Sequence, residues 1–194
     1  MKTVGLFFGT FNPIHLGHLA IANFFSENKA LQEVWLVVSP QSPFKQKQTL
    51  IENHHRLAMV KLAINGNPKL KVCTEEFNLP SPNYTIDSLQ HLKKKYPNDQ
   101  FTLILGQDNI VHFDRWKSYE QILDQFQIFV YPRSKSDEIP SKLLNHPNIT
   151  YFDASLLEVS ATEIRKGLKQ NEVVAKWLPN GVDAYLKNNT LTDL

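Results

Sequence analysis

The sequence predicts an α/β fold, doubly wound around a mostly parallel sheet, because strand-like apolar runs alternate with helical patterns. Most of these runs are continuously apolar, as is typical of strands that are covered on both faces. The helical patterns place apolar residues at spacings of three and four positions. Strands are expected at residues 3–8, 34–39, 70–74, 101–106, 128–131 and 149–152, and helices over residues 16–24, 57–64 and 86–96.

The C-terminal part is predicted to be helical from about residue 155 onward, with helices at 161–169, 173–178 and 182–188. A chain of 194 residues is long enough for one substantial core and short for two full domains. We therefore expect residues 1–194 to form a single domain, with residues 155–194 as its helical subregion.

The composition is that of an ordinary globular protein, with 42% hydrophobic and 21% charged residues. A formal net charge of +2 argues against nucleic acid or a membrane as partner, although a local basic patch can still hold a small anion. Cys73 is the only cysteine, so an intrachain disulfide and a thiolate zinc cluster are excluded. Its side chain is expected in the core. With no signal peptide and no apolar run of about 20 residues, the chain is expected in the cytoplasm. The oligomeric state stays open, a homo-oligomer included.

Residues Gly9–His18 (GTFNPIHLGH) form the most informative motif, because they join the first expected strand to the first expected helix. A glycine-containing turn at this point presents backbone N–H groups to an anion at the helix N-terminus. His15 and His18 can donate hydrogen bonds to phosphate oxygens, more strongly when protonated. Gly9 is expected to allow close approach of the backbone to phosphate, and Gly17 close packing of the helix. The sequence contains neither a P-loop nor G-x-G-x-x-G after this strand, and the histidines lack a nearby third zinc ligand.

A second anion site is predicted at Ser160–Arg165 (SATEIR), where the C-terminal helices begin. Ser160 and Glu163 have the spacing of a capping box, with Ser160 as the N-cap residue. The Arg165 guanidinium is expected to reinforce anion binding by the N-terminal amides of this helix.

The two motifs resemble the G-x-F-x-P-x-H-x-G-H and I-S-x-T-x-I-R signatures of the H-x-G-H nucleotidyltransferase superfamily, with Val159 in place of isoleucine. This resemblance implies a Rossmann-like nucleotidyltransferase fold that binds ATP. The implied catalytic residues are His15, His18, Lys45 and Arg165. The implied ATP-binding residues are Gly9, Thr10, Phe11, His15, His18, Gly106, Asp108, Ser160, Thr162 and Arg165.

Three segments in the middle of the chain also have ordinary structural interpretations. Thr85 is suited to cap a helix, residues 106–108 to end a strand in a turn, and Trp116 to fill a core. Together, residues 82–89, 106–108 and 115–119 resemble the P-S-Y-T-x-x-T-L, G-x-D and K-W-Y segments of bacterial nicotinate-nucleotide adenylyltransferases. The resemblance implies that Tyr84, Thr85 and Trp116 bind the acceptor, with Trp116 stacked on a pyridine ring. It also implies that Asp108 holds ATP through its ribose.

Two segments depart from this family's pattern. Residues 42–45 read Ser-Pro-Phe-Lys where the family often has P-P-H-[KR], so Lys45 is the basic member of the segment. Ser118 separates Trp116 from Tyr119, where the family commonly has W-Y. Both departures concern the acceptor side and leave the ATP motifs intact.

Two groups of charged or polar residues are interpreted as structural. His54, His55 and Arg56 begin a predicted helix as solvated or capping residues. Lysines 93–95 end another predicted helix, where they complement its dipole.

The resemblance implies adenylyl transfer from ATP to nicotinate mononucleotide, giving nicotinate adenine dinucleotide and pyrophosphate. A phosphate nucleophile needs no side-chain base, so catalysis is expected to rest on positioning and charge stabilisation. Mg²⁺ is expected to arrive with the ATP phosphates, without a metal site of the chain's own. Nicotinamide mononucleotide and phosphopantetheine stay open as alternative acceptors, and so does a catalytically silent nucleotide-binding sensor.

Overall fold

The computed structural model describes residues 1–41, 43, 50–132, 138–155, 157 and 159–191. Within these residues, six strands form one sheet in the order β3-β2-β1-β4-β5-β6, and every neighbouring pair is parallel. The strands are β1 (Thr3–Gly9), β2 (Glu33–Val38), β3 (Leu70–Cys73), β4 (Gln100–Gly106), β5 (Gln127–Tyr131) and β6 (Ile149–Tyr151). The doubly wound fold is confirmed, and each strand agrees with its prediction to within one residue at either end.

The longer helices also agree with the sequence pattern. They are α1 (Leu16–Ser26), α2 (Asn53–Ile64), α3 (Thr85–Lys95), α7 (Ala161–Lys169) and α8 (Val182–Asn188). The helix predicted at 173–178 is wrong in type, because only a 3₁₀ turn, η4 (Ala175–Trp177), forms there. Leu178 is extended, as the residue before a proline tends to be, and Pro179 follows it.

Several short elements had no counterpart in the pattern, since they are too short to show a helical period. They are η2 (Glu75–Asn78), α4 (Gln107–Ile110), η3 (Phe113–Arg115), α5 (Tyr119–Gln125) and α6 (Ser141–Leu144). Three of them, η2, α4 and η3, carry or adjoin residues of the site described below.

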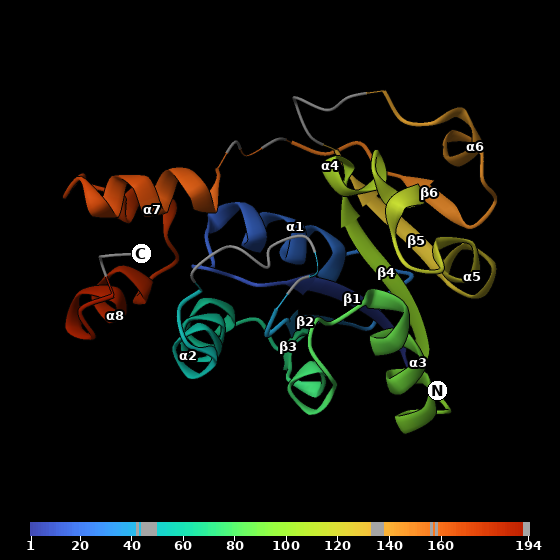
Figure 1. The fold of residues 1–194 in the computed structure, drawn as a ribbon, viewed down its shortest axis with the longest axis horizontal. Helices are drawn as coiled ribbons and strands as arrows, with labels where there is room; N and C mark the ends of the chain where they lie inside the picture. The colour runs from blue at the N-terminus through green and yellow to red at the C-terminus, as the bar shows by residue number, and fades with distance from the viewer. Residues whose placement is uncertain (42, 44–49, 133–137, 156, 158, 192–194) are drawn as a thin grey trace.

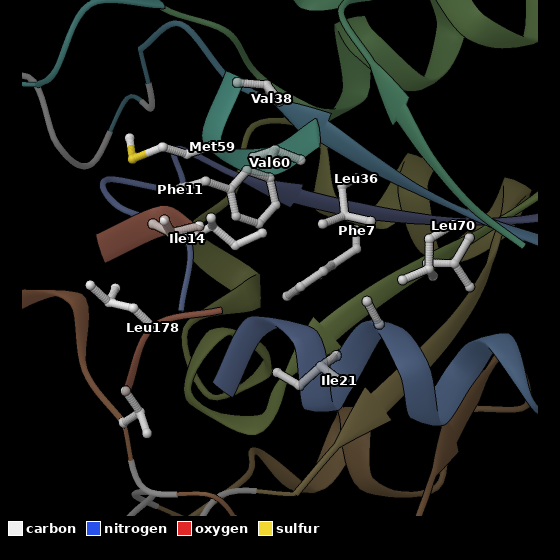
Figure 2. Packing of buried hydrophobic residues seen from close by; sticks show 14 of the residues in the cluster. Phe7, Phe11, Ile14, Ile21, Leu36, Val38, Met59, Val60, Leu70 and Leu178 are labelled. Carbon is white, nitrogen blue, oxygen red and sulfur yellow. The ribbon is translucent and has the colours of Figure 1, made fainter. Parts of the chain in front are cut away.

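Helices cover both faces of the sheet (Figure 1). One hydrophobic cluster unites β1, β2 and α1 with α2, α7 and α8, and Figure 2 shows Phe7, Ile21 and Met59 among its residues. The other cluster packs α3, α5 and α6 on the opposite face. Cys73 is buried in this second cluster, as expected, and burial raises the pKa of its thiol to about 11. No helix in the described ranges combines the length and the apolar character needed to cross a membrane.

The strand order reverses between β1 and β4, which lie side by side at the centre of the sheet. Ligands of doubly wound sheets bind beyond the carboxyl ends of the strands at such a reversal. Gly9 and Gly106 end these two strands, so the predicted motifs that follow them meet at this point. Helices α7 and α8 lie at the end of the molecule away from the N-terminus (Figure 1).

Candidate active site

A cavity of about 950 Å³ opens at the carboxyl ends of β1 and β4. Its walls come from the β1–α1 turn, the starts of α3 and α7, the segment after β4 and the segment around Trp116. Every predicted site residue in the described part of the chain lines it: Gly9, Thr10, Phe11, His15, His18, Tyr84, Thr85, Gly106, Asp108, Trp116, Ser160, Thr162 and Arg165. Lys45 lies outside the described residues. The cavity thus unites segments that are far apart in the sequence.

His15 and His18 form a reciprocal cap at the start of α1. The Nδ1 atom of each ring accepts the backbone N–H of the other residue, both at 3.3 Å. The rings stack with centroids 3.6 Å apart and planes inclined by 26°. Because Nδ1 is the acceptor in both, the proton of each neutral ring is assigned to Nε2. The cap therefore fixes the direction of two Nε2–H donors. It gives both histidines a structural role that needs no metal ion.

The two glycines of the motif make room for rings. A Cβ on Gly9 would lie 2.9 Å from the ring of Phe11, and one on Gly17 would lie 3.1 Å from the ring of His15. Phe11 is buried with a positive φ of 46°, and its ring meets that of His18 edge-on at 5.1 Å. The absence of a side chain at Gly9 thus leaves room for Phe11 to pack against the His18 ring. The sequence instead suggested that Gly9 allows the backbone to approach a phosphate closely.

The start of α7 is joined directly to the β1–α1 turn. Arg165 donates from Nη1 to the carbonyl of Asn12 at 2.7 Å and from Nη2 to Thr162 Oγ1 at 3.2 Å. Burial lowers the pKa of the Arg165 guanidinium from its usual value, and arginine stays charged at neutral pH. Ser160 is the N-cap, as predicted, but its hydroxyl accepts the N–H of Thr162 at 3.2 Å and not that of Glu163, so the predicted capping box with Glu163 is wrong. The β1–α1 turn and the start of α7 therefore face the same part of the cavity.

The opposite part of the cavity is built by α3 and the segment around Trp116. The prediction that Thr85 caps α3 is wrong, because Tyr84 is the N-cap and Thr85 is the first helical residue. Trp116 is half-buried and packs on Phe113, with centroids 5.2 Å apart. Lys117 ties the two segments together, since its Nζ lies 4.8 Å from the Tyr84 ring centroid and pairs with Asp87 on α3 at 2.8 Å.

Sequence reasoning missed Glu76 in the cavity wall. Its side chain is 2% exposed, and Oε1 accepts a hydrogen bond from Ser88 on α3 at 2.5 Å. Among the described residues, Oε2 is buried without a hydrogen-bond partner. Burial raises the pKa of Glu76, against the lowering effect of the hydrogen bond from Ser88. The rule that sites follow strand ends, applied to β3, would have pointed to this residue.

Glu76→Gln is expected to change how stability depends on pH. A carboxyl whose pKa is higher in the folded chain stabilises the fold below its unfolded pKa, and this contribution is lost as the pH rises through the folded pKa. The melting temperature of Glu76→Gln relative to the wild type should therefore rise as the pH increases above the ordinary range of a carboxyl group. Thermal unfolding followed by circular dichroism at several pH values measures the difference.

Glu75→Gln is the matched control, because the adjacent carboxyl has the opposite shift. Burial favours a higher pKa for Glu75, but hydrogen bonds from Lys95 and His91 outweigh it and lower the pKa. Its replacement should cost more stability at neutral pH than in acid. A difference for Glu76→Gln that is constant across the pH range would contradict the prediction.

The interpretation of Arg56 as a solvated or capping residue is wrong. Its side chain has no exposed surface, although it begins a helix beside the exposed His54. Carbonyl groups of two loops surround the guanidinium and accept the hydrogen bonds that water would accept at the surface. No residue spacing in the sequence reveals this arrangement. His55, in turn, contacts the hydroxyl of Tyr185 at 2.9 Å.

Comparison with known proteins extends over most of the chain. The cytidylyltransferase-like family pattern matches residues 6–167. A protein of Flavobacterium psychrophilum, named probable nicotinate-nucleotide adenylyltransferase, is 46% identical over 186 residues, which cover 96% of each chain. A protein of the same name from Cytophaga hutchinsonii is 48% identical over 171 residues, 88% of each chain.

A solved structure has the same fold. It is that of Plasmodium falciparum nicotinic acid mononucleotide adenylyltransferase complexed with NaAD, with a TM-score of 0.85 at 24% sequence identity. The match covers 100% of the present chain and 98% of the Plasmodium chain. At this identity, the likeness bears on the fold alone.

Proposed function

Because this chain belongs to the cytidylyltransferase-like family and, with its relatives, to the nicotinate-nucleotide adenylyltransferases, we propose that it transfers the adenylyl group of ATP to nicotinate mononucleotide. The products are nicotinate adenine dinucleotide and pyrophosphate, and the reaction is a step of NAD biosynthesis. The observation that carries this proposal is the 2.7 Å bond from Arg165 to Asn12, which unites the two motifs that the sequence predicts to bind phosphate.

The reaction needs positioning more than proton transfer. An oxygen of the acceptor's 5′-phosphate attacks the α-phosphorus of ATP, and the bond from that phosphorus to the α–β bridging oxygen breaks. The electron pair leaves with pyrophosphate. A phosphate dianion is already a competent nucleophile, so the protein's contribution is alignment and stabilisation of the charge that develops on the phosphate oxygens.

The phosphate end of the cavity offers donors for that charge. In our proposal, the Nε2–H groups of His15 and His18 bind the α- and β-phosphate oxygens. Arg165 and the amides at the start of α7 hold the departing pyrophosphate, supported by the positive end of the helix dipole. Ser160 keeps the first turn of α7 in place and Thr162 orients Arg165. Lys45 stays a prediction from the sequence as a further cation.

The other end suits an anionic pyridine nucleotide. We propose that Trp116 stacks on the pyridine ring and that Thr85, with the amides of the first turn of α3, binds the nicotinate carboxylate. The N-terminus of an 11-residue helix favours a negative group over a neutral amide, which supports the acid as acceptor. Tyr84 lies beside this turn, and Asp108, at the cavity edge after β4, is assigned to the ATP ribose.

Magnesium ion is proposed to enter with the nucleotide. Within the described ranges, no group of three or more His, Cys, Asp or Glu side chains could hold a metal ion. Mg²⁺ commonly keeps several waters and binds through substrate phosphates and one or two carboxylates. When bound, it would neutralise part of the triphosphate charge.

A single domain over residues 1–194 and a cytoplasmic location stay predictions from the sequence.

Pyrophosphate release from ATP tests the proposal with each acceptor in turn. Nicotinate mononucleotide should give the highest kcat/KM, ahead of nicotinamide mononucleotide and phosphopantetheine, with no release when the acceptor is omitted. A preference for either of the other acceptors would overturn the substrate assignment. ATP binding without turnover on any acceptor would favour the nucleotide-binding sensor instead.

A further inference from the structure

Arg56 is a fully buried cation whose hydrogen bonds are all made to the surrounding chain. Its five N–H donors meet five acceptors. These acceptors are the carbonyls of Ile51 (2.8 Å), Thr10 (2.5 Å), Ser39 (2.7 Å) and Pro40 (3.2 Å), and Oδ1 of Asn53. Among the described residues, no carboxylate forms an ion pair with it.

Packing alone does not account for a guanidinium at this position. Burying a charge without a counter-ion is costly, and apolar side chains of similar volume often replace buried ionic groups without loss of stability. Burial lowers the pKa of Arg56 to about 10, so the group is still cationic at neutral pH. The carbonyls that satisfy it are therefore held around a positive charge.

Those carbonyls belong to the two loops that leave the ends of β1 and β2. A single nitrogen, Nη1, binds the carbonyls of both Thr10 and Ser39, so it sets the distance between the loops. Thr10 belongs to the turn that carries His15 and His18, and the segment after Ser39 leads toward Lys45. Arg56 thus joins the turn that bears the two histidines to the first residues of the loop after β2.

The same network reaches α7. The Ile51 carbonyl accepts from Arg56 Nε, while the Ile51 N–H donates to Asn12 Oδ1 at 2.9 Å. The carbonyl of Asn12 accepts from Arg165. The β1–α1 turn is accordingly held at two points, by Arg56 at the Thr10 carbonyl and by Arg165 at the Asn12 carbonyl.

We propose that Arg56 is a positioning residue for adenylyl transfer, which fixes the β1–α1 turn against the loop after β2 so that the histidine donors meet the phosphates. This inference rests on the proposed function, because its test measures the rate of adenylyl transfer. None of the acceptors of the guanidinium belongs to the α3 or Trp116 segments, where the mononucleotide is assigned. The loop after β2 also reaches the start of α3, through the backbone bond from Asn83 to Gln41, so Arg56 should act mainly on ATP binding and turnover and much less on acceptor affinity.

Arg56→Met and Arg56→Lys test the proposal, with His54→Ala as the control. Misplacement of reacting groups by about 1 Å can lower the rate about 10²-fold, so Arg56→Met should lose about that much in kcat. Its KM for nicotinate mononucleotide should stay within about twofold of the wild type. Arg56→Lys keeps the charge but not the planar fork, so it should recover only part of kcat. His54, on the same turn of α2 with an exposed side chain, should be replaceable without effect.

Folding is followed by circular dichroism, so that loss of structure is separated from misplacement. Folded Arg56→Met with kcat within about threefold of the wild type would overturn the proposal. So would parallel losses in kcat and in affinity for both substrates. If Arg56→Met does not fold, Asn53→Ala replaces it as the test, because this variant removes one acceptor of the guanidinium. Asn53→Ala should lower kcat and leave the acceptor KM unchanged. A kcat equal to that of the wild type would count against the proposal.

Calorimetric binding of a non-hydrolysable ATP analogue keeps this inference distinct from the proposed function. If the wild type does not turn over nicotinate mononucleotide, the proposed function fails. Weaker analogue binding by Arg56→Lys than by His54→Ala would still support a positioning role at the phosphate end, and equal binding would refute it.

Discussion

Replacing His18 with alanine is expected to lower kcat for pyrophosphate release by about 10²–10³-fold, because the change removes a preorganised donor to the reacting phosphates. His18 also accepts the N–H of His15 through Nδ1, so alanine removes one bond of the α1 cap as well. Loss of a cap costs about 1 kcal/mol of stability, which leaves an ordinary domain folded. Initial rates at saturating ATP and nicotinate mononucleotide, with circular dichroism as a check on folding, measure both effects.

Two further variants separate the donor from the cap. The amide of His18→Asn lies near the position of Nδ1, so this variant should keep the cap and lose the catalytic donor. The longer His18→Gln carries its amide near the position of Nε2, so it should recover part of kcat. Near-normal turnover in His18→Ala or in His18→Asn would contradict the assigned role of Nε2.

Arg165→Ala is expected to raise the KM for ATP by about 10- to 100-fold, since hydrogen bonds to charged groups contribute about 1.5–3 kcal/mol. The KM for nicotinate mononucleotide should change little, because the acceptor is assigned to the α3 and Trp116 end of the cavity. Steady-state kinetics with each substrate varied in turn measures the two constants. Arg165→Lys retains charge but lacks the fork that reaches Asn12 and Thr162, so it should fall between alanine and the wild type. Equal increases in both KM values would point to a damaged fold instead of a lost phosphate contact.

The sheet could be read from the sequence because its strands are buried on both faces. Runs such as Val34–Val38 are continuously apolar, and their boundaries coincide with the polar loops that follow. Short helices such as α4 and α6 have no such signature, since four residues complete barely one turn.

The membership of the site could be predicted, but its internal contacts could not. The residues of the two motifs line the cavity, as predicted, but their spacing in the sequence gave no hint that His15 and His18 cap α1 through each other. The neighbours of Arg56 in the sequence are polar, which suggests a position on the surface. Only the tertiary structure places the carbonyls of Thr10 and Ser39 around it. Glu76 was overlooked for a similar reason, since burial decides its chemistry.

The bond from Arg165 to Asn12 joins a segment that is synthesised early to one that is synthesised 153 residues later, so the proposed nucleotide site cannot be complete before Arg165 has been made. The N-terminal motif emerges early, but β1 gains its second neighbour only when β4 has been made, and the phosphate end closes only after α7 has docked. Nascent chains that stop before Arg165 lack this closure whatever else they have folded. Since a ligand stabilises only the state that binds it, ATP bound as proposed would stabilise chains that contain both motifs in preference to chains that stop before Arg165.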